Sequence, residues 1–580
     1  MRNEGNRRSA QQYYYAAVRR QRRQWKCDPD LGGQPPTTTV IISAQGVGRN
    51  KQMGIVHSNV SIALDGINNF TDGDETFHWD NGFIGNVDIF TPDTTPALIT
   101  VTASFSGHWN MGRFSIGGET GSNIRAIVTD VATEHRYMDD MNLYGTGGNN
   151  VTLLHTDVQN FGGSEAADTL TVDSAVWMGA AQMFGGDDTV TVKGEAQIEV
   201  VNLGRGNNTL IIADNGQVGV VQAYDGNDSV SVNSSSGPDT VSLGSGDNTF
   251  ASTGGFVSAL TAYGGNDTAI IGADTGAVNL GNGNNTIITG AGSVDSIVAY
   301  GGADRVTLGS GNTGTIMVGG GNNIVTTGGG GVAAIITFQG NDHVTIGSGG
   351  VGSIDVGDGN NVVTLLKGVG GANAIRGGSG RDVYNVSSHR PLIADDGGFD
   401  TITTTLSWDL GDGRYPSIEK LTLLGGAAIN GHGNALNNVI AGNNAANNLN
   451  GGRGADTLFG LGGNDTLIGG LGKDLMAGGF GNDSFRFTSV AESPRGAGAD
   501  LITDFDDFGN DRIDLRDVFG GTLQYIHNAA FSAAGQVRIN DVAGPDVVVQ
   551  VNTFGTSVAE MEIRLSHTTL GSMNAGDFFL

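Results

Sequence analysis

The chain has 580 residues, of which 98 are glycine and only 10 are proline, and 38% are hydrophobic. Glycine of this abundance without a three-residue period excludes collagen, and it is typical of short buried strands joined by tight turns. Asp and Glu (59) outnumber Lys and Arg (30), and the formal charge of −29 disfavours nucleic acid and favours cations. The single cysteine, Cys27, excludes an internal disulfide. No apolar run approaches the ~18 residues of a membrane-spanning helix.

Residues 1–36 are basic and aromatic, with the run YYYAAVRRQRRQWK, and they end at Pro35 and Pro36. We expect a disordered tail rather than a nucleic-acid or membrane arm, because the rest of the chain is acidic. No apolar stretch follows this basic segment, so we expect no cleavable N-terminal secretory signal.

Residues 37–143 contain alternating, threonine- and valine-rich stretches such as TTTVIISAQ and ALITVTASF. This pattern predicts a β-rich N-terminal domain or a cap that hides the apolar end of a solenoid.

Residues 144–385 form a long repeat array in which loops such as YDGNDSVSV alternate with loops such as LGSGDNTFA. The marker residue of each loop alternates between aspartate and asparagine about every 19 residues, so the repeat is double. We expect each step to be one solenoid coil with two strands. The markers are Asp188, Asn208, Asp228, Asn248, Asp267, Asn285, Asp304, Asn323, Asp342, Asn361 and, in a closing nonapeptide, Asp382.

Each aspartate loop of this array opens with an aromatic residue, and each asparagine loop with leucine or valine. We expect these side chains to alternate in the interior, where large and medium groups interdigitate. The alternative is an exposed stripe that stacks on carbohydrate. The two sets are Phe184, Tyr224, Tyr263, Tyr300 and Phe338, and Leu203, Leu243, Leu280, Val318 and Val356.

Residues 386–432 interrupt the period and are predicted to be irregular connecting coils, whereas residues 433–486 are six contiguous nonapeptides. Each nonapeptide has a glycine-rich turn and a three-residue strand that buries its eighth residue. The sixth residues are Asn438, Asn447, Asp456, Asp465, Asp474 and Asp483. The fold class predicted for the whole chain is therefore all-β, a parallel β-roll or β-solenoid with β-rich caps at both ends.

Two nonapeptides make one coil, which places Asp456 over Asp474 and Asp465 over Asp483 at about 4.8 Å. Two bare carboxylates at that distance repel by about 3–4 kcal/mol at an effective dielectric of about 20. Calcium, which takes six to eight hard oxygen ligands, relieves this repulsion. In the long array the alternation with asparagine doubles the spacing, so a metal-free array held by asparagine ladders remains an open alternative there.

The predicted calcium ligands are carboxylates and one amide on the coils, together with backbone carbonyls of the glycine turns. They are Asp456, Asp465, Asp474, Asp483, Asp382, Asn447, Asp188, Asp228, Asp267, Asp304, Asp342, Gly452, Gly454, Gly463, Gly470, Gly472, Gly479 and Gly481.

Residues 487–580 continue as short amphipathic strands, with the segments ADLITDF (Asp500 to Phe505) and DRIDL (Asp511 to Leu515) and the end Asp577-Phe-Phe-Leu. With these segments and the nonapeptides, residues 433–580 resemble the C-terminal region of hemolysin-type (RTX) proteins, particularly the serralysin-type C-terminal domain. The resemblance implies calcium as cofactor and an uncleaved C-terminal signal for a type I exporter. It also implies an extracellular location, with residues 487–580 acting as β cap and secretion signal.

Catalytic motifs of zinc proteases, α/β-hydrolases and P-loop enzymes are absent from the sequence. We therefore expect a non-enzyme: a secreted structural or adhesive surface or matrix protein that folds with Ca²⁺ and contacts a polysaccharide. The alternative is a polysaccharide lyase or epimerase on the solenoid. Its candidate residues would be His78, Asp80, His108, His135, Asp139 and Asp140.

Overall fold

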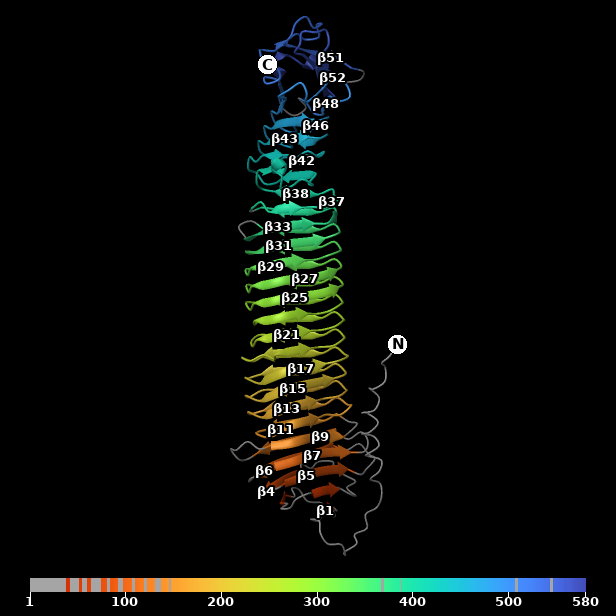
Figure 1. Ribbon diagram of the computed structural model, residues 1–580, viewed down its shortest axis with the longest axis vertical. Coiled ribbons are helices and arrows are strands. Elements are labelled where there is room, and N and C mark those ends of the chain that lie inside the picture. Colours follow the sequence, from red (N-terminus) through yellow and green to blue (C-terminus); the bar gives the residue numbers. More distant parts are fainter. Residues whose placement is uncertain are drawn as a thin grey trace, which may run out of the picture.

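The computed structural model is a long stack of coils that rises from β1 near one end to the C-terminus at the other (Figure 1). The basic tail 1–36 lies outside the described residues. The structure describes strands within residues 38–144, and residues 148–580 apart from 367–369, 388, 506–509 and 543–545.

One long face of the stack is a parallel sheet, called here the first sheet, in which each strand pairs with the equivalent strand of the next coil. It comprises β1 (Thr38–Ile41), β3 (Val60–Ala63), β5 (Ile84–Thr91), β7 (Asn110–Gly118), β9 (Tyr137–Tyr144), β11 (Asp157–Gly162), β13 (Trp177–Gln182), β15 (Gln197–Gly204), β17 (Gln217–Ala223), β19 (Thr240–Ser242), β21 (Val257–Thr261), β23 (Thr275–Asn279), β25 (Val294–Gly301), β27 (Thr313–Gly320), β29 (Val332–Ile336), β31 (Gly349–Gly357), β33 (Gly370–Gly377) and β36 (Leu392–Ala394).

The second sheet is parallel along the stack and gains an antiparallel end, because β51, β52 and β53 pair antiparallel in the C-terminal cap. It comprises β2 (Gln52–Gly54), β4 (Glu75–Asp80), β6 (Leu98–Ser106), β8 (Asn123–Asp130), β10 (Asn150–Leu154), β12 (Thr169–Asp173), β14 (Thr189–Val192), β16 (Thr209–Ala213), β18 (Ser229–Asn233), β20 (Thr249–Ser252), β22 (Thr268–Ile271), β24 (Thr286–Thr289), β26 (Arg305–Thr307), β28 (Ile324–Thr326), β30 (His343–Ile346), β32 (Val362–Leu365), β35 (Val383–Val386), β38 (Thr401–Thr404), β40 (Lys420–Leu423), β42 (Val439–Ala441), β44 (Thr457–Phe459), β46 (Leu475–Ala477), β48 (Asp500–Ile502), β50 (Gln524–Tyr525), β51 (Gln536–Asp541), β52 (Val547–Asn552) and β53 (Met561–Leu565).

Where the first sheet ends at β36, a third, parallel sheet begins and continues to the C-terminus. Its strands are β39 (Trp408–Asp409), β41 (Gly431–His432), β43 (Asn448–Arg453), β45 (Thr466–Leu471), β47 (Ser484–Arg486), β49 (Arg512–Asp514) and β54 (Phe578–Phe579). The remaining elements are the strand pair β34 (Ser379–Gly380) and β37 (Gly397–Gly398) and the 3-10 turns η1 (Leu410–Asp412), η2 (Leu570–Ser572) and η3 (Ala575–Asp577).

The register of the sheets confirms that one sequence step is one coil with two strands. In the second sheet Thr189 pairs with Thr209, and in the first sheet Gln197 pairs with Gln217. The strands within residues 38–144 extend the same two sheets toward the N-terminus, since β8 pairs with β10 and β9 with β11.

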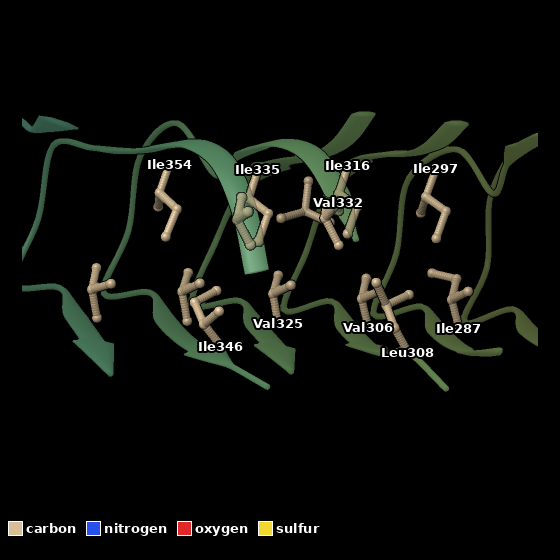
Figure 2. Close-up of a cluster of buried hydrophobic side chains, with 14 of the residues drawn as sticks. Ile287, Ile297, Val306, Leu308, Ile316, Val325, Val332, Ile335, Ile346 and Ile354 are labelled. Atoms are coloured by element: carbon tan, nitrogen blue, oxygen red, sulfur yellow. The ribbon is translucent and has the colours of Figure 1, made fainter. Parts of the chain in front are cut away.

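The core lies between the sheets and repeats from coil to coil (Figure 2). Ile297, Ile316 and Ile335 are aligned neighbours in the first sheet, and they face Ile287, Val306 and Val325 of the second sheet. All six side chains are fully buried. Each such burial contributes about 1.5–3 kcal/mol, so stacking further coils extends the core. The predicted all-β parallel solenoid is confirmed.

Candidate metal centre: a carboxylate ladder along the solenoid

The four aspartates predicted in the nonapeptide roll (residues 433–486) stand just before strands β44, β45, β46 and β47, and all four are buried. In each carboxylate, Oδ1 accepts the backbone N–H of the equivalent residue one coil earlier. Asp474 accepts from Asp456 at 2.8 Å, and Asp483 accepts from Asp465 at 2.7 Å. The predicted stacking of Asp456 on Asp474 and of Asp465 on Asp483 is confirmed.

The second carboxylate oxygen, Oδ2, of these four aspartates is buried and has no hydrogen-bond partner among the described residues. Burial raises the pKa of Asp456 and Asp465 to about 7 and that of Asp474 to about 6, and it also raises the pKa of Asp483. Burying a carboxylate oxygen without a partner costs free energy unless a proton or a cation compensates it.

The first glycine of each of the four aspartate nonapeptides faces this orphaned oxygen. A Cβ at Gly451 would lie 2.4 Å from Oδ2 of Asp456, and a Cβ at Gly469 would lie 2.4 Å from Oδ2 of Asp474. Glycine at this position therefore keeps open the space beside the carboxylate. The glycines predicted to offer carbonyls share positive φ angles, between 91° and 156°: Gly452, Gly454, Gly463, Gly470, Gly472, Gly479 and Gly481.

Asn447 also stands on the ladder, but its amide is hydrogen-bonded within the protein. Its Nδ2 donates to the carbonyl of Ile429 at 2.6 Å, and its Oδ1 accepts from the backbone of Asn443 at 2.8 Å. Unlike the aspartates, Asn447 leaves no orphaned oxygen.

The same ladder runs without a break through the long array, where aspartate and asparagine alternate. Asp188 donates its N–H to Oδ1 of Asn208, Asn208 donates to Asp228, and each bond is 2.9 Å. The pattern continues from coil to coil to Asp382, so the structure aligns all predicted markers of this array. Orphaned Oδ2 atoms occur on the aspartate coils: Asp188, Asp228, Asp267, Asp304, Asp342 and Asp382.

On the asparagine coils the side-chain amide donates a hydrogen bond to a backbone carbonyl of its own turn. Nδ2 of Asn208 donates to the carbonyl of Gly206 at 3.0 Å, and Nδ2 of Asn248 donates to Gly246 at 2.9 Å. Asn323 and Asn361 donate to Gly319 and Gly357 in the same way. The asparagine hydrogen bonds that the metal-free alternative invokes are thus present, and the alternation leaves one orphaned carboxylate on every second coil.

Sequence reasoning missed four ladder aspartates. Asp168 and Asp400 belong to the long ladder, through their bonds to Asn149 and Asp382. Asp500 and Asp511 extend the roll by accepting from Asp474 and Asp483. The available signal was an aspartate two residues before a buried apolar strand residue, as in Asp168-Thr-Leu, Asp400-Thr-Ile, Asp500-Leu-Ile and Asp511-Arg-Ile.

The prediction that the five loop aromatics are interior was wrong: they are exposed, from 47% for Phe338 to 66% for Tyr263. The equivalent position in the intervening coils is glycine, since Gly204 and Gly244 lie against the backbone carbonyls of Phe184 and Tyr224. Leu203 and its equivalents are buried, but one position earlier in the coil. The exposed residues, called here the aromatic column, are Phe184, Tyr224, Tyr263, Tyr300 and Phe338.

The candidate residues of the enzyme alternative are not brought together by the described part of the chain. His78 and Asp80 belong to β4, and Asp139 and Asp140 to β9 in the other sheet. Asp140 accepts a hydrogen bond from Asn160 at 2.9 Å. His108 and His135 lie outside the described residues.

Among the described residues, no helix is long and apolar enough to cross a membrane.

The chemistry of the ladder fits calcium. Calcium prefers several hard oxygen ligands, and the ladder presents buried, unpartnered carboxylate oxygens next to glycine turns rich in carbonyls. The residues present therefore suit the cation that the nonapeptides imply.

Comparison with known families agrees with this geometry. The model of the RTX calcium-binding nonapeptide repeat matches residues 280–313, 432–467 and 450–485. The chain thus carries RTX calcium-binding nonapeptide repeats on a β-solenoid, and these repeats support Ca²⁺ as its cofactor.

Two solved structures illustrate the similarity, and both are subunits of the AlgE6 mannuronan C5-epimerase from Azotobacter vinelandii. The R3 subunit is 30% identical over 25% of this chain and 78% of its own, with a TM-score of 0.21. The R2 subunit is 27% identical over 27% of this chain and 92% of its own, also with a TM-score of 0.21. No curated protein matches the chain.

Proposed function

We propose that this protein is a secreted, non-catalytic structural or adhesive component of a cell surface or matrix, and that calcium drives its folding after type I export. The observation that carries the proposal is the row of buried, orphaned Oδ2 atoms on stacked coils. In the absence of calcium these carboxylates must either stay charged and unpaired or take up protons, and both disfavour the folded roll at neutral pH.

The position of the C-terminus supports export before folding. Phe578 is buried and pairs with Ile513 in the third sheet, while the ring of Phe579 lies under Arg512 at 4.6 Å. The segment that resembles a type I signal is therefore part of the folded cap. An exporter would read it while the chain is still unfolded, in a cytosol poor in calcium.

Circular dichroism and thermal melting of the full chain test the calcium part. We expect excess Ca²⁺ to give strand signal and a cooperative melt at neutral pH, and a chelator to remove a large part of both. Strand content and melting temperature unchanged by the chelator would contradict the proposal.

The aromatic column supports the adhesive part, with a polysaccharide as partner. Its rings recur every second coil, at about 9.6 Å for strands stacked ~4.8 Å apart, which is of the order of two sugar rings in an extended chain. Exposed aromatics in a row provide flat apolar faces, and such patches mark interaction sites. Beside the column Arg205 pairs with Asp225 at 3.7 Å, which leaves Glu165 as the uncompensated charge among the described residues there and favours an uncharged polysaccharide over an acidic one.

The groove along Phe184, Tyr224 and Tyr263 has the polar groups that such a ligand needs. Its volume is about 810 Å³, and Gln182, Gln222 and Ser242 contribute to its lining. Amide and hydroxyl side chains beside ring faces can hydrogen-bond sugar hydroxyls while the rings stack on sugar C–H groups.

Affinity electrophoresis through gels containing neutral linear polysaccharides, with alginate as the acidic comparison, tests this part. We expect retardation by a neutral polysaccharide that the double substitution Tyr224→Ala/Tyr263→Ala abolishes. Phe554→Ala is the matched control, because Phe554 is 76% exposed in the C-terminal cap, away from the column. Equal retardation of both variants would contradict a role for the column.

A further inference from the structure

A cluster of three carboxylates lies where the first sheet ends. Asp382 precedes β35, Asp395 follows β36 and Asp400 precedes β38. One carboxylate oxygen from each lies within 4.8 Å of the others. Asp382 and Asp400 are consecutive ladder residues, because the N–H of Asp382 donates to Oδ1 of Asp400 at 2.8 Å.

The third carboxylate is the unusual feature. Asp395 stands five residues before Asp400, the position that glycine holds in all six nonapeptides of the roll, as Gly451 does before Asp456. In the roll that glycine faces the orphaned Oδ2. At this coil an additional carboxylate occurs where the roll has only a hydrogen atom.

Two of the three side chains present unpartnered oxygens. Oδ2 of Asp382 and Oδ2 of Asp400 have no hydrogen-bond partner among the described residues, and the two residues are 1% and 0% exposed. Asp395 is half-buried, and its Oδ2 accepts a hydrogen bond from the hydroxyl of the buried Tyr384. Tyr384 therefore fixes the position of Asp395, while the buried Oδ2 atoms of Asp382 and Asp400 have no hydrogen-bond partner among the described residues.

Oxygens of Asp382 and Asp395 converge on one small space beside Gly377. A Cβ there would lie 2.4 Å from Oδ2 of Asp395, 2.7 Å from Oδ2 of Asp382 and 2.1 Å from the Tyr384 hydroxyl. Among the ion pairs of the described residues, none joins Lys, Arg or His to any of the three aspartates. Three convergent carboxylates without a cationic side chain are a ligand set for a hard divalent cation.

We propose that Asp382, Asp395 and Asp400 form a separate, three-carboxylate calcium site that clamps the junction between the long array and the connecting coils. The proposal rests on the proposed calcium dependence of the chain. It differs from the roll sites in its ligands, because two ladder carboxylates are joined by a third one from the turn. It ties β36, the last strand of the first sheet, to β35 and β38 of the second sheet.

Terbium luminescence of the full chain tests the site, because a nearby tyrosine sensitises bound Tb³⁺ and Tyr384 contacts Asp395. We expect tyrosine-excited emission that Ca²⁺ displaces. Asp395→Asn, which removes the third negative charge and places an amide beside the two orphaned Oδ2 atoms, should lose one class of calcium sites in calorimetric titration, and with it the emission that Tyr384 sensitises. Tyr384→Phe should lose that emission but keep calcium binding. Asp396→Asn is the matched control, since Asp396 is exposed and paired with Arg376 at 2.8 Å.

The outcomes separate this site from the proposed function. If Asp395→Asn binds as many calcium ions as the native chain while chelator still unfolds the roll, the junction site is wrong and the calcium-dependent roll stands. A cluster that takes up only a proton would give the same unchanged stoichiometry, and it would equally overturn the site. If chelator leaves the circular dichroism of the full chain unchanged, the proposed function fails instead. Circular dichroism of Asp395→Asn in excess Ca²⁺ checks that this variant still folds.

Discussion

The long array and the nonapeptide roll share one ladder geometry but differ in what occupies it. In the array, aspartates such as Asp228 alternate with asparagines such as Asn248, whose Nδ2 donates to a glycine carbonyl of its own turn. In the roll every coil from Asp456 onward carries aspartate on both edges, and each Oδ2 is orphaned. The asparagine amides are therefore satisfied within the protein, whereas every marker position of the roll from Asp456 onward leaves a carboxylate oxygen for a cation to compensate.

The spacing of the charges sets how much more strongly the carboxylates repel one another in the roll than in the array. Charged carboxylates on adjacent coils, about 4.8 Å apart, repel by about 3.5 kcal/mol at an effective dielectric of about 20. On alternate coils the distance doubles and the repulsion falls to about 1.7 kcal/mol. The array should therefore tolerate calcium removal better than the roll.

The largest expected effect comes from converting the roll to the asparagine pattern. The variant Asp456→Asn/Asp465→Asn/Asp474→Asn/Asp483→Asn should melt at similar temperatures in calcium and in chelator. The native chain should gain about 2.7 kcal/mol per site at free calcium 100-fold above Kd. The matched control replaces Asp188, Asp228, Asp267 and Asp304 with asparagine, and it should keep most of the calcium response. If the roll variant kept its calcium response, the roll aspartates would not be the cause of the calcium dependence.

The metal-free chain should be more stable at mildly acidic pH than at alkaline pH. Burial raises the pKa of Asp456 and Asp465 to about 7 and that of Asp500 to about 8, above the ordinary value of 3.8. The folded state therefore binds more protons than the unfolded state, so this stability is fully present below pH ~4 and is lost as pH rises through about 7 to 8. The summed effect should be several kcal/mol.

Urea unfolding in chelator at pH 5 and pH 8 measures this dependence. Saturating calcium should weaken it, because protons and calcium compete for the same oxygens. A metal-free chain that gains stability between pH 5 and pH 8 would show that the buried carboxyls do not govern the roll.

Adding a carboxylate to the array should make it resemble the roll. Asn248→Asp places a third charge between Asp228 and Asp267 and removes the Nδ2 bond to Gly246. We expect two new repulsions of about 3.5 kcal/mol each in chelator, a loss that calcium largely restores. Asn312→Asp, which adds the same charge at an exposed residue, should change unfolding little. Equal losses in both variants would mean that charge spacing on the ladder does not matter.

The smallest effect is steric. Gly469→Ala would put a Cβ 2.4 Å from Oδ2 of Asp474, which should cost about 1–3 kcal/mol and weaken calcium binding at that coil. In Gly462→Ala the nearest atom is 3.5 Å away, an ordinary contact, so this variant is the control. Calcium titrations that are indistinguishable for the two variants would argue against the role assigned to the first glycine.

The period of the sequence predicts the solenoid, the coil length and the stacking of Asp456 on Asp474. A fixed repeat places equivalent residues at the same point of successive coils, so they stack on one another. The period does not predict which face of a strand a side chain occupies when two loops differ by one residue in register. Tyr224 precedes its ladder residue by four positions and Leu203 by five. In a strand a shift of one residue reverses the face, so two residues that looked equivalent in the loop pattern point in opposite directions.

Other residues of the site lie in coils that do not follow the nonapeptide pattern. Asp400, Asp500 and Asp511 lack the full glycine pattern that marks a nonapeptide, so the strand pairing places them on the ladder, and the only sequence signal is the apolar residue two positions later. Asp395 is informative only after Asp400 is aligned with the roll, since its place at the first position of the turn is then visible.

Hydrogen exchange of the full chain, measured by mass spectrometry in calcium and in chelator, compares the roll and the array in one experiment. We expect chelation to remove protection from the strands between Val439 and Asp514 while the strands between Thr189 and Leu365 keep most of theirs. Protection that is lost equally in both regions, or in neither, would contradict the idea that orphaned carboxylates on consecutive coils make the roll depend on calcium.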